Sequence, residues 1–351
     1  MKVLLIGQGI SGTWLSYWLW REGADVVVID DALPESASRV ASGVINPVTG
    51  RQVVTTWMAD TLLPFAWDHY LHLGHEAGTG IISDTGILAF PPSQQMLDAY
   101  LEKAHDGSPY VHLLTEQDPF EGYFHFKFGM VSIRPAYWID LPAMLVGWRQ
   151  WLQQRGMLVA ARFNEDELVL KGTSVGYQHI EADKVIYCDG PSGALSRYWQ
   201  GLPFSFNKGE ALIVDIPGLP SGQVYKFGIS TLVPWQQGLW WVGSSYDNHF
   251  KDTLPSAAFR ARMESFLLLT LKLPYKVVDH LAAIRPATVE RRPFAGLHPV
   301  HAQVGILNGM GTKGVSLAPW LGRQLARHIL FGEALEPAAD VKRFKRAFTT
   351  G

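Results

Sequence analysis

Cysteine is almost absent from this chain, and its scarcity excludes several classes of protein. Cys188 is the one cysteine among 351 residues, so the chain has no internal disulfide framework and no cysteine-rich zinc or iron–sulfur site. We expect no metal centre. Because thiols stay reduced in the cytoplasm, we expect a cytoplasmic protein.

An excess of charge of either sign is also missing. Lys and Arg total 30 against 32 for Asp and Glu, which gives a net charge of −2, and no polybasic run offers a nucleic-acid footprint. We therefore expect no nucleic acid as a dedicated partner. Hydrophobic residues make up 47% of the chain, and its length predicts roughly two domains with ample cores.

Long apolar runs are lacking too. The run at residues 3–6 meets glycines at once and lacks the layout of a signal peptide. The uncharged stretch from Phe227 to Tyr246 is interrupted by Pro234 and Gly238, which predicts two strands and a turn in place of a membrane span. We expect a soluble protein without a transmembrane segment.

A nucleotide-binding pattern is present in the first thirty residues. Residues 1–6 predict a buried parallel strand, and Gly7-Gln8-Gly9-Ile10-Ser11-Gly12 follows it as a G-x-G-x-x-G motif. A helix to about residue 22 and a strand at 25–29 come next, and Asp30 ends that strand. Such glycines let a pyrophosphate approach the backbone at a helix start, and the acid accepts hydrogen bonds from a ribose. This order predicts a dinucleotide site, but Asp30 does not distinguish NAD from FAD.

The rest of the chain mixes parallel-sheet elements with segments typical of antiparallel strands. Residues 184–188 and 304–307 predict further buried strands, whereas 206–246 is rich in strand formers and 120–133 alternates like a strand. We expect an α/β chain (α+β overall) in which a Rossmann-like dinucleotide domain is interrupted by a mainly antiparallel substrate domain. We assign residues 1–85, 132–205 and 283–351 to the first domain and residues 86–131 and 206–282 to the second.

A second glycine-rich loop favours a flavin over a nicotinamide. Residues 308–314 lie far from the first motif, yet they again join a strand to a helix. A reduced flavin carries negative charge around N1 and the C2 carbonyl, and a helix N-terminus stabilises that charge. A nicotinamide ring gains positive charge on oxidation and would not benefit from the same dipole.

In the order and spacing of its landmarks, the chain resembles the D-amino-acid oxidase superfamily of FAD-dependent amine oxidases, which includes glycine oxidase and sarcosine oxidase. The resemblance covers nearly the whole chain, although no landmark after the first is specific alone. The landmarks are Gly7–Gly12 with Asp30, then residues 41–43, 187–193, 232–234 with 242–244, 284–288 and 308–322.

The resemblance implies a bound FAD. The FAD is expected to be noncovalent, because relatives with covalent flavin use a cysteine near residue 285 and this chain has none there. Two departures concern the site: Met310 stands where relatives often have histidine, and residues 189–193 differ from the usual motif. The residues implied to contact FAD are Gly7, Gly9, Ile10, Ser11, Gly12, Asp30, Ala41, Ser42, Gly43, Val44, Ile45, Phe163, Gly190, Gly309, Gly311, Thr312, Lys313 and Gly314.

Two cationic residues are candidates for catalysis. Arg285 matches the arginine that pairs with the substrate carboxylate in amino-acid oxidases, and its planar fork suits that task. The alternative is a structural ion pair, for example with Glu290. Lys313 stands where some sarcosine-oxidase-like relatives place a lysine that helps to hold the carboxylate, and it could equally face phosphate, flavin or solvent.

Four further residues are candidates for the substrate pocket. Arg51 could be a second anion contact or a surface residue. Tyr225, Phe227 and Tyr246 lie where relatives carry pocket aromatics, although core packing explains any one of them as well.

The function that the resemblance implies is FAD-dependent oxidation of a small amine-bearing carboxylate, an amino acid or an N-alkyl glycine, by hydride transfer to flavin N5 with an imine as product. The alternatives are an FAD-dependent 2-hydroxy-acid dehydrogenase, a flavoprotein acting on a modified tRNA base, and a flavin-binding protein without turnover. One feature favours the flavin-binding protein without turnover. Trp18 and Trp20 in the first predicted helix cannot both face the sheet, so one of them could lie in an interface with a partner. A homo-oligomer is left open.

Overall fold

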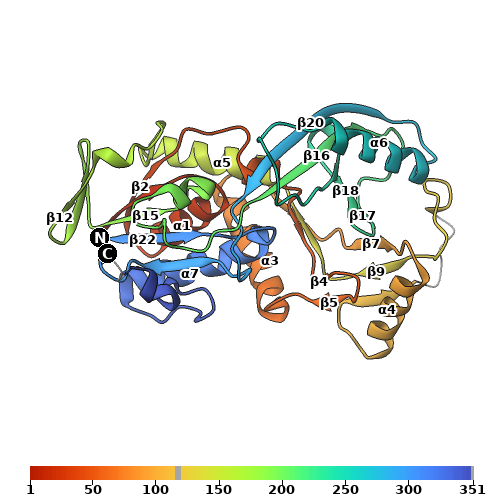
Figure 1. The fold of residues 1–351 in the computed structure, drawn as a ribbon, viewed down its shortest axis with the longest axis horizontal. Helices are drawn as coiled ribbons and strands as arrows, with labels where there is room; N and C mark the ends of the chain where they lie inside the picture. The colour runs from red at the N-terminus through yellow and green to blue at the C-terminus, as the bar shows by residue number, and fades with distance from the viewer. Residues whose placement is uncertain (115–119, 349–351) are drawn as a thin grey trace.

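Two large sheets organise the computed structural model, which describes residues 1–114 and 120–348 (Figure 1). The six-stranded sheet has the order β11-β2-β1-β15-β22-β21, and all of its pairs are parallel except that of β21 with β22. Its strands are β1 (Lys2–Ile6), β2 (Asp25–Ile29), β11 (Leu158–Val159), β15 (Lys184–Tyr187), β21 (Phe294–Leu297) and β22 (Val304–Asn308).

The eight-stranded sheet has the order β20-β16-β19-β18-β17-β7-β9-β8. Among the described residues its one parallel pair is β17 with β7, so the expectation of a mainly antiparallel second unit is met. The strands are β7 (Ile87–Phe90), β8 (Val111–Leu113), β9 (Val131–Ile133), β16 (Asn207–Asp215), β17 (Val224–Phe227), β18 (Ser230–Pro234), β19 (Trp240–Gly243) and β20 (Lys276–Arg285). The long strands β16 and β20 extend from one half of the molecule into the other (Figure 1).

Smaller sheets complete the strands. Strands β3 (Val44–Ile45), β10 (Tyr137–Ile139) and β6 (Ile82–Ser83) form one, and β4 (Val48–Thr49) pairs with β5 (Val54–Thr55). A third small sheet joins β12 (Leu168–Lys171), β13 (Ser174–Tyr177) and β14 (Ile180–Ala182). The helices are α1 (Ile10–Arg21), α2 (Ala37–Val40), α3 (Ala59–Glu76), α4 (Gln94–His105), α5 (Leu141–Gln154), α6 (Ala257–Thr270) and α7 (Gly314–Phe331).

Helices α1 and α7 run parallel and touch closely. A Cβ added to Gly314 would lie 3.3 Å from Ile10, and one added to Gly322 would lie 3.2 Å from the Trp14 backbone. With α3 and α5 they bury one face of the six-stranded sheet, while the β12–β14 sheet covers the other. The starts of α1 and α7 therefore lie side by side.

Trp18 and Trp20 of α1 make their contacts within this chain. Trp18 is 5% exposed, and its indole Nε1 donates to the Pro319 carbonyl at 2.9 Å. Trp20 is partly buried and packs edge-on against Trp151, with ring centroids 4.6 Å apart. Packing within this chain therefore accounts for both side chains, and the helix gives no support to an interface.

Some sequence expectations need correction. Of residues 120–133, only Val131–Ile133 form a strand. The alternating aromatics Phe124 and Phe126 lie outside it, where both pack onto Phe90 and Phe124 forms a single bridge with Leu271. The expected domain boundaries at 131/132 and 282/283 fall inside β9 and β20, and each of these strands belongs wholly to the eight-stranded sheet. Among the described residues, no helix combines the length and apolar character needed to cross a membrane.

Candidate functional site

The first glycine motif forms a turn with no room for side chains. Gly7 has φ +94°, and a Cβ there would lie 2.7 Å from the Cys188 carbonyl oxygen. A Cβ on Gly12 would lie 1.9 Å from the Gly7 carbonyl oxygen. These two glycines are therefore required for β1, α1 and the end of β15 to meet.

The start of α1 leaves hydrogen-bond donors available. Gly9 is the N-cap residue and supplies no side-chain acceptor. Among the described residues, no acceptor contacts the N–H groups of Ser11 and Gly12, whereas the Ile10 N–H donates to Ser38 Oγ at 3.0 Å. Unpaired amides at a helix start form an anion site that suits a pyrophosphate. Sequence reasoning missed Ser38, which lies three residues before the expected contact segment 41–45.

Asp30 lies beside this turn at the end of β2. Its carboxylate accepts the Gln8 N–H at 2.9 Å and the Ala32 N–H at 2.8 Å. The guanidinium of Arg149 on α5 donates to the same carboxylate at 2.6 Å. Arg149 thus neutralises the negative charge of the half-buried Asp30 carboxylate. Sequence analysis did not find this pair because the two residues are far apart in the chain. The ribose role of Asp30 stays a prediction.

Phe163 follows β11, which pairs with β2. Its ring packs against Tyr177 and Tyr187, with centroids 4.9 and 5.9 Å away. The structure accounts for this side chain by packing, and the contact between its backbone and adenine stays a prediction.

The second glycine loop mirrors the first. Gly309 and Gly311 adopt φ +75° and +56°, and α7 then begins at Gly314 behind the N-cap residue Lys313. Within the described part of the chain, no acceptor contacts the N–H groups of Thr312 and Gly314. These donors lie next to the start of α1, so two positive helix ends face one region.

Asn308 connects this loop to the loop after β15. Its side-chain amide donates to the Gly190 carbonyl at 2.8 Å and lies 3.3 Å from Asp189 Oδ1. Gly190 has φ +60°, which a side chain would strain. Among the described residues, the donors at both helix starts match the phosphate and carbonyl groups of a flavin dinucleotide, so the donor set fits FAD.

The segment 41–45 separates these loops from the eight-stranded sheet. Gly43 has φ +80°, and a Cβ there would lie 2.0 Å from the Ile139 carbonyl oxygen, so close backbone packing against β10 requires this glycine. Ala41 ends α2, and Ile45 is 2% exposed and pairs with Tyr137. The contacts of this segment with FAD stay predictions.

A cavity of about 140 Å³ lies between this segment and one face of the eight-stranded sheet. The sheet contributes residues that are in register on neighbouring strands: Lys226 pairs with Thr231, and Thr231 pairs with Gly243. Register partners of antiparallel strands share a face, so these three positions form one wall. The cavity is lined by Ser42, Val44, Asn46, Ile87, Lys226, Ile229, Thr231, Trp241, Gly243 and Ser244.

Arg285, at the end of β20, reaches the edge of this cavity. Its guanidinium donates to Asn207 Oδ1 at 2.6 Å and to Ser244 Oγ at 3.0 Å, and Ser244 lines the cavity. The alternative ion pair is not formed, because Glu290 pairs with Arg343 at 3.1 Å. Burial lowers the pKa of Arg285 from its ordinary value.

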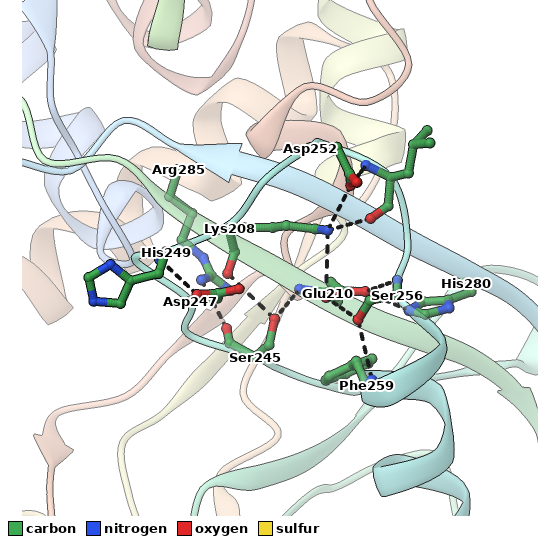
Figure 2. Close-up of polar contacts among 11 residues, drawn as sticks. Lys208, Glu210, Ser245, Asp247, His249, Asp252, Ser256, Phe259, His280 and Arg285 are labelled. Atoms are coloured by element: carbon green, nitrogen blue, oxygen red, sulfur yellow. Dashed lines mark hydrogen bonds and ion pairs between the residues drawn. The ribbon is translucent and has the colours of Figure 1, made fainter.

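A chain of hydrogen bonds fixes the surroundings of Arg285 (Figure 2). The guanidinium donates to the Ser245 carbonyl at 3.1 Å, and Ser245 Oγ accepts the Glu210 N–H at 2.8 Å. The buried Glu210 carboxylate accepts the Ser256 N–H at 2.6 Å and its hydroxyl at 2.9 Å, which anchors the start of α6. The residue after Arg285 connects this region to the second glycine loop, because the Pro286 carbonyl accepts the Gly311 N–H at 3.0 Å.

The predicted pocket aromatics are not where the resemblance implied. Tyr225 and Phe227 pack on the opposite face of the sheet, in the apolar cluster beneath α6, because alternate residues of a strand point to opposite faces. Lys226, between them, lines the cavity and was missed; a lysine within a buried strand was the available signal. Tyr246 is 59% exposed and Arg51 lies on the exposed turn between β4 and β5, and neither lines the cavity.

Lys313 is half-buried at the start of α7 and does not line the cavity. Burial, together with the nearby cations Arg292 and Arg291, lowers the pKa of this lysine. Its position at the loop favours the cofactor over the substrate as its partner, and that assignment stays a prediction.

Comparisons with known proteins identify the family of this chain. The sequence profile of the family described as FAD dependent oxidoreductase (DAO) matches residues 2–328. The chain belongs to this family. The resemblance to the D-amino-acid oxidase superfamily is thereby confirmed, and the protein is an FAD-dependent oxidoreductase.

Relatives of this oxidoreductase match it over nearly their whole length. The uncharacterized oxidoreductase YurR of Bacillus subtilis (strain 168) is 24% identical, over 93% of this chain and 94% of its own. The structure of iminodiacetate oxidase (IdaA) from Chelativorans sp. BNC1 has a TM-score of 0.76 and 22% identity, over 95% of this chain and 96% of its own. Glycine oxidase from Bacillus cereus ATCC 14579 has a TM-score of 0.80 and 16% identity, over the same shares. These structures share the fold.

Proposed function

We propose that this oxidoreductase oxidises a small amine-bearing carboxylate, an amino acid or an N-alkyl glycine, at the carbon next to nitrogen. The observation that carries the proposal is the guanidinium of Arg285 at the cavity edge. Its N–H groups donate to neutral acceptors, and among the described residues no carboxylate oxygen lies within 4.0 Å of a guanidinium nitrogen, the limit for an ion pair. A charged fork held in place without an acidic partner is well prepared to bind a substrate carboxylate.

The cavity size supports a small substrate. At about 140 Å³ it is well below the roughly 300–1,000 Å³ typical of pockets for drug-sized ligands. A 2-hydroxy acid would need a base for its hydroxyl proton, usually histidine, and no histidine is among the residues that line the cavity.

The names of structural neighbours support the same substrate class. Iminodiacetate oxidase, glycine oxidase and the L-proline dehydrogenase from P. horikoshii are each named for an amine that carries a carboxylate. The last has a TM-score of 0.76 and 16% identity.

The residues proposed to hold FAD are those of the two glycine loops. The amides of Ser11 and Gly12 would bind the pyrophosphate, and those of Thr312 and Gly314 the pyrimidine edge of the flavin. When bound, FAD would supply the acceptor for a hydride from the substrate carbon, and the imine product would be hydrolysed by water. Arg285 would orient the substrate carbon toward that acceptor, and the segment 42–46 would exclude water. With no cysteine near residue 285, binding would be noncovalent.

The test is anaerobic reduction of the purified flavoprotein by a panel of amino acids and N-alkyl glycines, followed by visible absorption. A substrate bleaches the flavin band. Arg285→Met should keep the flavin and raise the KM strongly, while Arg260→Met, the same change on the exposed face of α6, should leave it unchanged. A flavin that no amine reduces, or an Arg285→Met variant with unchanged turnover, would refute the proposal.

A further inference from the structure

A second cation faces the same cavity. Lys226 lies on β17 with its side chain on the cavity wall, beside Thr231. Its neighbours in sequence point into the apolar cluster on the other side of the sheet. The strand therefore presents one charged group, alone, to the cavity.

Within residues 1–114 and 120–348, no acidic side chain pairs with this charge. The ammonium of Lys226 donates to the Gly228 carbonyl at 2.8 Å, and among the described residues no carboxylate lies within 4.0 Å of it. An ammonium has three N–H donors, so further donors are available to a ligand. Burial lowers the pKa of Lys226, which is the expected cost of a charge removed from water without a counter-ion.

The two cations lie at opposite ends of a neutral wall. Lys226 is on β17, and Arg285 reaches the cavity at Ser244, directly after β19. Only β18 separates β17 from β19, so the backbones of these two strands are about 10 Å apart. Arg285 itself is on β20, two places beyond β19, and its long side chain extends back to Ser244. The strand positions between the two cations are Thr231 and Gly243, and neither carries a charge. A ligand with an anionic group at each end would supply a counter-ion to both cations.

We propose that Lys226 binds a second carboxylate of the substrate, so that the preferred substrates are dicarboxylic amines, either acidic amino acids or N-carboxyalkyl glycines. The proposal rests on the proposed function, because it takes Arg285 as the receptor of the first carboxylate. Lys226 then determines specificity: a second carboxylate supplies the counter-ion that the protein omits, whereas an apolar substrate end leaves the ammonium unpaired.

The test compares two ligands that differ by one carboxylate. Thiodiacetate and (methylthio)acetate have sulfur where the substrate has nitrogen, so neither is an amine substrate. Their Kd values for the holoenzyme are measured by calorimetry, with the shift of the flavin band as a second readout. We expect thiodiacetate to bind about tenfold or more tighter, which is the size of one charge-assisted hydrogen bond.

Variants assign that preference to one residue. Lys226→Met should abolish the preference for thiodiacetate while the Kd of (methylthio)acetate stays the same, and Lys226→Arg should keep much of it. Arg285→Met should weaken both ligands. Lys276→Met, the same change at an exposed position of β20, should alter neither. Melting temperatures verify that each variant is folded, and Lys226→Gln is a second neutral replacement.

The contrary outcomes are distinct. Equal binding of both ligands by the wild type, or equal weakening of both by Lys226→Met, would overturn the proposal. So would a Lys226→Met variant with unchanged Kd values whose flavin reduction is slowed only at the higher pH values where a lysine would be deprotonated, which would make the lysine a proton acceptor. Reduction by glycine or sarcosine but not by iminodiacetate or aspartate would overturn it while the proposed function stands. A different outcome is that thiodiacetate binds in a Lys226-dependent way but no amine reduces the flavin. In that case Lys226 would still be a carboxylate-binding residue, and the proposed oxidation of an amine would be refuted.

Discussion

Gly209→Ala should displace Arg285 without altering the arginine itself. Gly209 lies on β16 beside β20, and a Cβ added there would come within 2.1 Å of the nearest guanidinium nitrogen of Arg285 and 2.2 Å of its Cζ. These atoms form the far end of a flexible side chain, so the side chain has to move and the sheet can stay in place.

The size of the effect follows from this geometry. Ordinary contact begins at 3.4 Å, so the nearest nitrogen must retreat by about 1.3 Å from its 2.1 Å approach. A displacement of about 1 Å at a positioning group can reduce catalysis about 100-fold. We therefore expect kcat/KM for an amine-bearing carboxylate to fall by about two orders of magnitude, close to the effect of Arg285→Met.

The assay is steady-state oxidation of whichever amine reduces the flavin, together with the Kd of a carboxylate inhibitor. Gly222→Ala is the matched control, because a Cβ at Gly222 meets no atom within 4 Å. Flavin content and melting temperature should be near those of the wild type in both variants. A Gly209→Ala enzyme with a wild-type KM and inhibitor Kd would refute the idea that the present position of the guanidinium is the binding position.

Two further predictions concern the cofactor domain. Gly12→Ala should yield a less stable protein with little bound flavin, since its Cβ would lie 1.9 Å from the Gly7 carbonyl oxygen. The ratio of flavin to protein absorbance measures the bound flavin, and Gly80→Ala is the control because a Cβ there meets no atom within 4 Å. A Gly12→Ala variant with a full complement of flavin would contradict the prediction. Burial raises the pKa of Asp189 from 3.8 to about 7, so the folded state holds a proton that the unfolded state releases, and stability should fall as pH rises across that window. Asp189→Asn should therefore gain stability relative to wild type between pH 5 and pH 8, measured by thermal unfolding at constant FAD, and a parallel pH dependence of the two proteins would contradict the assignment.

Features encoded locally could be predicted from the sequence. The strand, glycine turn, helix and second strand that end in Asp30 are consecutive, and each is indicated by its own residues. Helix α5 begins after Asp140, whose carboxylate accepts the Ala143 N–H at 3.0 Å, and α4 begins after Ser93 in the same way. Caps and apolar periods act within a few residues, so one sequence suffices to find them.

Features set by tertiary packing could not be predicted. The alternation of β17 separates Lys226 from its aromatic neighbours, but the choice of face depends on α6, which covers the other side. The partner of Asp30 is Arg149, more than a hundred residues away on a helix that had no other mark of function. The aromatics were chosen by residue type, and residue type carries no information on which side of a sheet faces a cavity.

The parallel pair α1 and α7 has a consequence for the order in which the molecule is made. The ribosome releases α1 long before α7, and β1 gains its neighbour β15 only after the intervening segments have emerged. Until residues 314–331 have been made, the start of α1 lacks the helix start that lies beside it in the folded protein. If both helix starts hold FAD, as we propose, a nascent chain would bind flavin only after α7 has been made, and flavin absorbance in truncated chains that end before and after α7 would measure this.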